Sequence, residues 1–505
     1  KKEIETLNSF KNLTVKTRTS LAAYHSYNYL LARENLTDHL SLNERKDKIR
    51  QRLWKIRAKK VIIATGAIER PLIFNNNDRP GIILSSSIKK YIDYYGVKCG
   101  QKISLFTNND SAYETSISLN NNGVNVNSVI DIRDKSNSSI VKQAEKLGIK
   151  IHWKHTVVNT HGYKKINSIE LMKISDDGSG VVGNKINFEC DCLGISGGWT
   201  PMVHLFTQSG GKLKFRDSDN VFLPDKAPSD QISVGSCNGD FELDNILKNS
   251  NKSVKEFLNI DNSDYDNLDI ICSKEVDKKN IWLLPSDKPL GKTKPFLDFQ
   301  NDSTAKDVKL ALREGFKSIE HVKRYTTTGM GTDQGKLSNM HALGIVAETA
   351  GVKMGELGTT TFRPPYTPLS FGAIVGRNVG EFFDITRKTP IHDWHVEHKA
   401  EFENVGQWKR AWYYPKENEN MHQAVQRESK AARDSAGILD ASTLGKIDIQ
   451  GTDSSEFLNR VYTNAWSKLE IGKCRYGLML NEDGMVYDDG VTTRLGENHY
   501  IMTTT

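Results

Sequence analysis

The chain has 505 residues, of which 37% are hydrophobic and 26% are charged, and its formal net charge is +7. This length exceeds one ordinary hydrophobic core, so we expect several domains of about 100–200 residues each. No run of about 18 apolar residues is present, which disfavours a membrane protein and predicts a soluble, globular one. The charge is small and spread over stretches of both signs, which favours neither a nucleic-acid nor a lipid partner.

The cysteines predict reduced thiols in a cytoplasmic protein with no metal site. Their one close pair, Cys190 and Cys192, has no second pair to complete a set of metal ligands. The others are scattered: Cys99, Cys237, Cys272 and Cys474. The opening KKEIETLNSF lacks a start methionine and a signal peptide's apolar core, and the closing HYIMTTT stops inside a predicted strand. We therefore expect both ends to be truncations.

Residues 12–64 alternate short β-rich runs (LTVKT, RLWKIRA, KKVIIAT) with one long polar stretch, which predicts a β-meander feeding a strand. That strand ends in VIIATGAIERP, residues 61–71. Gly66 lets the backbone pass close to a ligand at the strand's carboxyl end, where α/β sheets bind dinucleotides. Thr65 and Gly66 are therefore candidate cofactor contacts. The other reading is an ordinary exit from strand to loop.

From Lys102 the pattern predicts a β-α-β unit: KISLF, then SAYETSISLNNNG, then VNVNSVIDI. Its turn, residues 107–112, reads TNNDSA where a dinucleotide-binding turn has G-x-G-x-x-G/A, although Asp131 lies where a ribose-binding acid is expected. Without the first two glycines the backbone cannot approach a pyrophosphate closely. This predicts a structural Rossmann domain without nucleotide. The alternative is a cofactor held by asparagine side chains.

Two later helices are predicted from their caps. In STAKDVKLALREG, Thr304 is the cap and an aspartate answers it three residues on. In DSSEFLNRVY, Asp453 is the cap, and Phe457 and Val461 are expected to share one face. Between them, NMHQAVQRESKAARDSAG predicts a third helix.

The order of these features resembles the α subunit of heterotetrameric sarcosine oxidase. An ATG strand end is followed by a glycine-poor inserted Rossmann domain, and then FLDFQNDSTAKDVKLALREGFKSIEHVKRYTTTGMGTDQGKLS resembles a bacterioferritin-associated ferredoxin-like [2Fe-2S] module. From Arg427 to Val491, GILDASTLGKIDIQGTDSSEFLNRVYTN and GKCRYGLMLNEDGMVYDDGV follow the glycine-cleavage T-protein pattern. Dimethylglycine and single-chain sarcosine dehydrogenases lack the ferredoxin-like module, so they are disfavoured.

The resemblance implies a multidomain α/β and α+β chain. It joins a two-dinucleotide-binding-domain, glutathione-reductase-like flavoprotein fold to a ferredoxin-like module and a T-protein-like folate domain. The expected segments are 1–98 (outer dinucleotide-binding domain), 99–198 (inserted Rossmann-like domain), 199–250 (return to the outer domain), 251–345 (ferredoxin-like module), 346–400 (linker) and 401–505 (start of the folate domain).

In the outer domain the resemblance implies NAD. Ser236 follows Gly235 where FAD-binding relatives carry an acid for the ribityl chain, and in sarcosine oxidase α subunits this site holds NAD instead. The implied contacts also include Leu21, Phe241 and Leu243, each of which could equally be core packing. The Gly-rich pyrophosphate loop is expected upstream of Lys1.

The ferredoxin-like module is predicted to hold no iron–sulfur cluster. Asp298, Gln300, Asp333 and Ser338 stand in place of its four cysteines, and hard oxygen ligands do not replace thiolates there. The loop KRYTTTGMGTDQG is rich in hydroxyls, glycines and cations. By resemblance it would help line an FMN shared with the β subunit, through Lys323 and Thr328. A capped surface loop is the other reading.

In the folate domain the pair Asp488 and Asp489 lies where the T-protein family places the acid that faces folate and the reacting carbon. A carboxylate there could orient the pterin amine or stabilise an iminium-like species. These two are the candidate catalytic residues, and Thr504 is a candidate folate contact. The alternative is a turn aspartate after NEDG.

The activity implied is oxidative demethylation of sarcosine to glycine with O₂, which gives H₂O₂ and, with tetrahydrofolate, 5,10-methylenetetrahydrofolate, or formaldehyde without folate. The expected partners are an FAD-carrying β subunit that performs the oxidation, and γ and δ subunits. Two alternatives stay open. One is the equivalent subunit of an N-methylglutamate dehydrogenase, and the other is a non-catalytic assembly scaffold, suggested by the lost glycines and cysteines.

Overall fold

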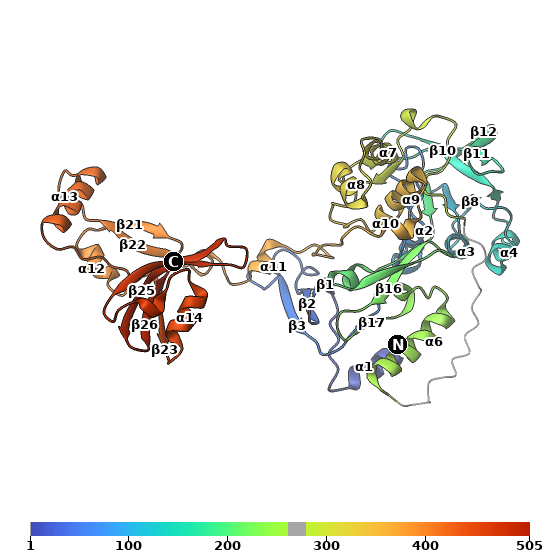
Figure 1. The fold of residues 1–505 in the computed structure, drawn as a ribbon. Coiled ribbons are helices and arrows are strands. Elements are labelled where there is room, and N and C mark those ends of the chain that lie inside the picture. The colour runs from blue at the N-terminus through green and yellow to red at the C-terminus, as the bar shows by residue number, and fades with distance from the viewer. Residues whose placement is uncertain (1, 261–278) are drawn as a thin grey trace. The chain divides into compact units, whose positions relative to one another are not determined.

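A computed structural model describes residues 2–260 and 279–505 and contains two compact units, Lys1–Ile374 and Val375–Thr505 (Figure 1). Cys272, which is predicted to be a reduced thiol, lies outside the described residues. The other five cysteines are free thiols.

The first unit opens with α1 (Lys2–Ser9) and an antiparallel meander of β1 (Thr19–His25), β2 (Tyr29–Asn35) and β3 (Gln51–Arg57). The predicted strand LTVKT was wrong, because residues 13–17 form no strand. All of residues 11–18 are exposed, so their apolar side chains have no sheet to pack against.

The outer domain continues through β4 (Val61–Ile63), which pairs in parallel with β17 (Gln231–Ser233), although the two are far apart in sequence. The chain leaves and re-enters this domain through an antiparallel pair, β5 (Ala67–Glu69) and β14 (Trp199–Pro201). The other elements here are α5 (His204–Gln208), β15 (Lys212–Arg216), β16 (Val221–Lys226), η1 (Gly235–Asn238) and α6 (Leu243–Leu258).

The inserted domain is a parallel five-stranded sheet in the order β6-β13-β7-β8-β9, which confirms the predicted β-α-β unit. Its strands are β6 (Ile82–Leu84), β7 (Ile103–Thr107), β8 (Val126–Asp131), β9 (Ile151–Trp153) and β13 (Cys192–Ser196). Its helices are α2 (Ser85–Tyr95), α3 (Ser111–Asn121) and α4 (Ser139–Lys146), and a second sheet holds β10 (His155–His161), β11 (Ser168–Ile174) and β12 (Val181–Glu189). All five residues of β7 are buried, as expected for a strand covered on both faces.

The remainder of the first unit is a small helical module around a core that includes Leu297, Val308 and Leu343. The predicted cap is confirmed: the Asp307 carboxylate accepts from the Thr304 backbone N and hydroxyl, both at 2.7 Å. The elements are η2 (Leu290–Lys292), β18 (Phe296–Asp298), β19 (Ser303–Thr304), α7 (Ala305–Arg313), α8 (Ile319–Thr326), α9 (Asn339–Ala350), α10 (Met354–Leu357) and α11 (Phe371–Val375).

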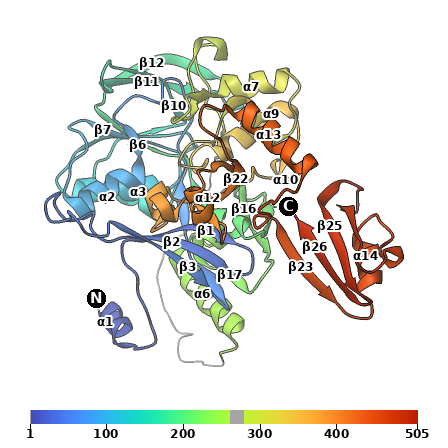
Figure 2. The ribbon, with the colours of Figure 1, turned by 90° about the vertical axis from the view of Figure 1, so that its left-hand side faces the viewer.

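The second unit has a four-stranded antiparallel sheet in the order β23-β26-β25-β24, and Figure 2 shows β23, β26 and β25 side by side with α14 next to them. The bounds are η3 (Gly380–Phe382), β20 (Arg387–Lys388), α12 (His392–Glu397), β21 (Glu401–Val405), β22 (Trp408–Tyr413), α13 (Met421–Asp434), β23 (Gly445–Gln450), α14 (Ser454–Val461), η4 (Trp466–Lys468), β24 (Cys474–Leu480), β25 (Val486–Gly496) and β26 (His499–Thr504).

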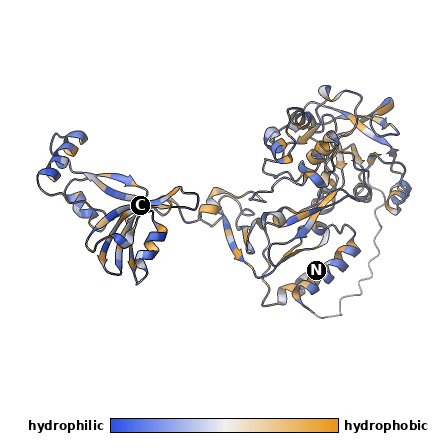
Figure 3. Ribbon diagram, in the orientation of Figure 1, coloured by the Kyte–Doolittle hydropathy of each residue, from blue (hydrophilic) through white to orange (hydrophobic). Residues whose placement is uncertain are grey.

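The core of this unit joins α14 to the sheet. Leu458 is fully buried beside Tyr462 and Trp466, whereas Phe457 is 52% exposed. The buried face runs through Leu458 and Tyr462, four residues apart, with Val461 packed at its edge. The predicted helix α13 is mostly hydrophilic (Figure 3), and its one buried residue is Ala424.

Candidate cofactor and folate sites

The outer domain brings four predicted cofactor residues to one edge. Because β4 and β17 are parallel neighbours, Thr65 and Gly66 follow one strand end while Gly235 and Ser236 follow the other, and Val234 N donates to Ile63 O at 2.9 Å. The Thr65 hydroxyl donates to Met202 O at 2.9 Å. Gly66 has a φ of +71°, and no atom lies within 4 Å of the position a Cβ would take. This strand end is open to a ligand.

The three apolar candidates surround this edge differently. Leu21 packs against the cluster that contains Ile63 and Cys237, and its carbonyl accepts from the Thr367 hydroxyl at 3.1 Å. Phe241 is half-buried in the returning loop, and Leu243 begins α6 with 53% of its surface exposed. The fold therefore places Leu21 beside the strand ends and leaves Leu243 on the surface.

His204, which the sequence did not single out, begins α5 two residues after Met202. It is 4% exposed, and its ring lies 3.9 Å from that of Phe362. Burial lowers the pKa of His204 to about 3, and the charge of Lys336 acts in the same direction. Lys336 donates to Tyr366 O at 2.7 Å. A neutral buried imidazole thus lies where the outer domain meets the helical module.

In the helical module three of the four positions aligned with cluster cysteines carry side-chain hydrogen bonds instead. Asp298 Oδ2 accepts from Gly329 N at 2.7 Å, and Gln300 Oε1 accepts from Asp333 N at 3.1 Å. Asp333 Oδ1 accepts from Gly335 N at 3.0 Å, and Ser338 is buried at the start of α9. Within residues 2–260 and 279–505, no group of three or more His, Cys, Asp or Glu is arranged to hold a metal ion.

The two predicted FMN contacts lie in different surroundings. Lys323 Nζ donates to Thr361 O at 3.2 Å, and burial lowers the pKa of this amine while Glu320 opposes the shift. Thr328 is only 2% exposed, and its hydroxyl accepts from that of Thr326 at 2.9 Å. Lys323 therefore keeps a partly accessible side chain, whereas Thr328 is directed into the module.

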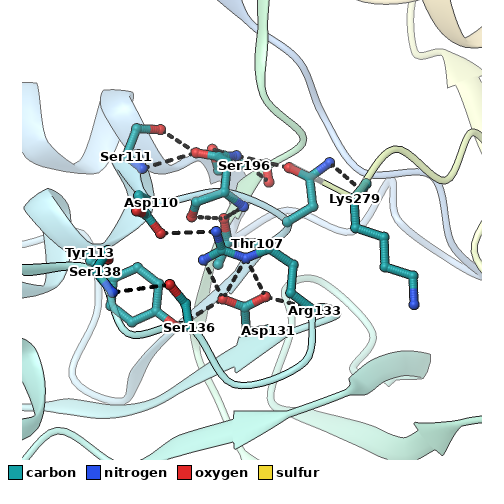
Figure 4. A network of polar contacts seen from close by, with 12 residues as sticks. Thr107, Asp110, Ser111, Tyr113, Asp131, Arg133, Ser136, Ser138, Ser196 and Lys279 are labelled. Carbon is teal, nitrogen blue, oxygen red and sulfur yellow. Dashed lines mark hydrogen bonds and ion pairs between the residues drawn. The ribbon is translucent and has the colours of Figure 1, made fainter. Parts of the chain in front are cut away.

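The inserted domain fills its own turn with side chains (Figure 4). Asp131 is fully buried and binds the Arg133 guanidinium, with Nη2 to Oδ2 at 2.8 Å, and the Tyr113 hydroxyl donates to the same oxygen at 2.9 Å. Arg133 Nη1 also contacts Asp110 Oδ1 at 2.9 Å. Burial and Asp131 together raise the pKa of Tyr113, so the phenol stays protonated and donates.

The candidate catalytic pair lies on β25 of the second unit. Asp488 Oδ1 accepts from the Thr505 hydroxyl at 2.5 Å and from Asp489 N at 2.8 Å, and the Tyr476 hydroxyl donates to Asp489 Oδ2. Thr504 is the Cα partner of Gly445 in the β23–β26 ladder. Hydrogen bonds from Thr505 lower the pKa of Asp488, so this carboxylate is ionised at neutral pH.

A buried Tyr–His–Asp arrangement in the same unit was not predicted. His395 Nδ1 lies 2.5 Å from the Tyr414 hydroxyl, and Nε2 lies 2.9 Å from Asp440 Oδ2. Burial raises the pKa of Asp440, but hydrogen bonds from Ser442 and His395 outweigh burial and hold it well below its usual range. This arrangement ties α12 and the end of β22 to the loop before β23.

The fold matches that of the two-dinucleotide-binding-domain flavoproteins, joined to the start of an aminomethyltransferase-like domain. L-proline dehydrogenase from P. horikoshii superposes with a TM-score of 0.51 at 20% identity, covering 74% of this chain and 68% of that one, so the likeness shows the fold alone. Residues 292–377 match the Sarcosine oxidase A3 domain family, and residues 391–505 match the GCVT N-terminal domain family.

The chain is similar along nearly its whole length to the α subunits of sarcosine oxidase, as the order of its motifs predicts. Sarcosine oxidase subunit alpha of Corynebacterium sp. (strain U-96) is 41% identical over 509 residues, which cover 99% of this chain and 52% of that protein. The same subunit of Rhizobium meliloti is 38% identical, covering 99% of this chain and 49% of that protein. The chain thus spans about half the length of the curated relatives it matches.

The described helices give no candidate membrane span. None of those within residues 2–260 and 279–505 is both long enough and apolar enough to cross a bilayer.

Proposed function

We propose that this chain acts within a sarcosine oxidase that demethylates sarcosine to glycine and reduces O₂ to H₂O₂. The observation that carries the proposal is the 41% identity to sarcosine oxidase subunit alpha across 99% of the chain, with the A3 and GCVT domains in order. The oxidation itself is assigned to FAD in a β subunit, and γ and δ subunits complete the assembly. This chain then contributes cofactor binding and capture of the one-carbon unit.

The outer domain's strand ends support NAD as the resident dinucleotide. The open space at Gly66 leaves room for a ligand at this strand end, and Gly235, at the neighbouring strand end, also has a positive φ. Ser236 cannot act as a carboxylate toward a ribityl chain, and this favours NAD over FAD. NAD held here would not exchange hydride during turnover. Leu21 would contact the adenosine half, and Ser236, Phe241 and Leu243 would contact the dinucleotide from the segment that returns to the outer domain.

The A3 domain supports a shared FMN rather than an iron–sulfur cluster. The oxygens of Asp298, Gln300 and Asp333 already accept backbone N–H groups, so the fold is complete without a metal. FMN supplies the route by which electrons leave toward O₂. Lys323 would place a cation beside that flavin. Thr328 would hold the loop in place through its hydrogen bond with Thr326.

The second unit supports folate-dependent capture of the released carbon. The oxidised substrate is an iminium, CH₂=NH⁺–CH₂COO⁻, whose CH₂ carbon is attacked by a folate nitrogen, with glycine leaving. Asp488 is ionised at neutral pH and can stabilise the cation electrostatically. Asp489, held by Tyr476, can orient the folate amine or accept its proton. Thr504 lies on the adjoining strand. Without folate, water releases formaldehyde.

The test is to assay the assembled, full-length complex for H₂O₂ with sarcosine and with N-methylglutamate as competing substrates. The proposal predicts peroxide formation with a kcat/KM for sarcosine well above that for N-methylglutamate. Preference for N-methylglutamate, with electrons passed to an acceptor other than O₂, would assign the chain to the dehydrogenase instead. If the complex assembles but oxidises neither substrate, the alternative of a non-catalytic assembly scaffold would remain.

A further inference from the structure

In doubly wound sheets, ligands bind at the carboxyl ends of the parallel strands. In the inserted domain those ends are Thr107 of β7, Asp131 of β8 and Ser196 of β13, which are neighbours in the sheet. All three side chains are fully buried, at 0% exposure. The edge at which this fold accepts a dinucleotide is therefore covered by protein.

At the position of the ribose-binding acid, the acceptor sites of the Asp131 carboxylate are already filled by donors of this chain. Asp131 Oδ1 accepts from Arg133 N at 2.9 Å and Nε at 3.1 Å, and Oδ2 accepts from Arg133 Nη2 and from the Tyr113 hydroxyl. A carboxylate has about four lone-pair sites, and four donors from this chain already use them. The Arg133 fork is 4% exposed and reaches Asp110 with its remaining arm (Figure 4).

The position of the pyrophosphate is filled in the same way. The first N–H groups of α3 would face a phosphate in a dinucleotide-binding turn. Here Asn109 Oδ1 accepts from Ser111 N at 3.0 Å and from its hydroxyl at 2.5 Å, while the Thr107 hydroxyl accepts from Asn109 N at 3.1 Å. The amide oxygen of Asn109 takes the place of a phosphate oxygen.

A third contact closes the edge with a distant part of the chain. Asn108 Nδ2 donates to Gly197 O at 3.3 Å and to Lys279 O at 3.1 Å, so the stretch that leads into the A3 domain crosses the turn. The buried charges also oppose an anion. The carboxylates of Asp110 and Asp131 share the single guanidinium of Arg133, which leaves this network negative overall.

We propose that Arg133 is a built-in ligand of the inserted domain: its guanidinium, with Asn109 and the Lys279 backbone, occupies the place of a dinucleotide. The alternative of a cofactor held by the asparagine side chains fails, because those side chains are already bonded within the chain. The domain then serves as a rigid connector between the outer domain and the A3 domain. The complex accepts no second dinucleotide there, so external NADH or NADPH cannot deliver electrons through this domain.

Chemical rescue tests the built-in ligand. Arg133→Ala in the assembled complex leaves a guanidinium-sized space between Asp110 and Asp131. We expect the Tm to fall by several degrees and to be restored by at least half with millimolar guanidinium chloride, well below denaturing concentrations. Urea at the same concentration should have no such effect. Arg313→Ala, which removes a highly exposed arginine, should show neither loss nor rescue. Absence of rescue in folded Arg133→Ala would overturn the proposal.

A second measurement covers the case in which Arg133→Ala does not fold. Wild-type complex is titrated with NADPH and with ADP-ribose, alongside Asp131→Asn and the outer-domain variant Ser236→Asp. We expect Asp131→Asn to bind both nucleotides as the wild type does, because neither nucleotide binds in the inserted domain. Binding lost with Asp131→Asn but kept with Ser236→Asp would place a nucleotide in the inserted domain and overturn the proposal. Loss with Ser236→Asp alone concerns the outer NAD site and leaves this inference intact.

Discussion

Asp488 and Asp489 are adjacent on β25 and are held by different partners. Asp488 is held by Thr505. Asp489 is bound by Tyr476 from the neighbouring strand. Burial raises the pKa of Tyr462, and both carboxylates raise it further, so this buried phenol stays neutral. The two aspartates therefore have separable environments, and single substitutions can tell them apart.

Replacing Asp489 with asparagine keeps the shape but removes the charge. We expect formation of 5,10-methylenetetrahydrofolate to slow by about 100-fold, the usual loss for a general acid–base group. Peroxide formation should be unchanged, because the proposed function assigns oxidation to another subunit, so formaldehyde should replace the folate product. Tyr476→Phe, which keeps the carboxylate, should cost less than 10-fold. Equal folate product from Asp489→Asn and wild type would assign the role to Asp488 or to neither.

His204 predicts a pH dependence of stability. Its folded-state pKa of about 3 lies below the ordinary 6.5, so the unfolded chain binds a proton that the folded chain does not. Stability is thus fully present above pH 6.5 and is lost as pH falls. Between pH 7 and pH 5 this one group should remove about 2 kcal/mol from the free energy of unfolding. Urea unfolding at both pH values should show a smaller pH effect for His204→Gln, whereas the exposed control His39→Gln should keep the wild-type effect.

At the residue scale, the sequence offers candidates where the signal is local. Thr65 and Gly66 were singled out because a strand, a glycine and a turn follow one another; the β4–β17 pair brings Gly235 to the same edge, and their binding of a cofactor stays a prediction. His204 carried no local signal, because its burial depends on Phe362, more than a hundred residues away. His395 and Asp440 were missed for the same reason, since only the folded chain brings them together.

At the scale of elements, α7 depends on its cap. The Asp307 carboxylate accepts from both the N–H and the hydroxyl of Thr304, which satisfies groups at the helix start. We expect Thr304→Ala to destabilise the module by about 1 kcal/mol. Arg313→Ala, at the exposed end of the same helix, should change stability by less than about 0.5 kcal/mol. Thermal unfolding of the two variants side by side measures the difference, and equal Tm values would show that the cap contributes nothing.

The neighbours Leu458 and Phe457 on α14 form a matched pair for the second unit. Leu458 is fully buried against Tyr462 and Trp466, so Leu458→Ala should cost about 2–5 kcal/mol. Phe457 is 52% exposed, and Phe457→Ala should cost less than about 1 kcal/mol. Denaturant unfolding of the two variants side by side measures both losses. A larger loss for Phe457→Ala would mean that the helix presents its other face.

What the sequence could not decide at this scale has a common cause. Periodicity places Phe457 and Val461 on one helix face, but it does not say which face meets the sheet. Composition makes LTVKT resemble a strand, but a strand also needs a neighbour to pair with. Both questions depend on tertiary contacts, whereas the cap of α7 and the β-α-β unit are set within a few residues and were predicted. The side chain of Asp453 makes no cap hydrogen bond at the start of α14.

For the whole molecule, the order of domains identifies the relatives more strongly than any single motif. The outer fold, the inserted domain, the A3 domain and the GCVT domain occur here in one chain that is similar to sarcosine oxidase α subunits over 99% of its length. The substrate and the electron acceptor could not be read from these residues. The domain order itself predicts that the oxidised carbon passes to folate.

The most direct test of the proposed function follows the methyl carbon of sarcosine. The assembled full-length complex is given [methyl-¹³C]sarcosine, O₂ and tetrahydrofolate, and labelled products are followed by NMR while peroxide is quantified. We predict one H₂O₂ for each glycine, with the ¹³C label appearing in 5,10-methylenetetrahydrofolate rather than as formaldehyde. If sarcosine keeps its label and no peroxide forms, the account is wrong.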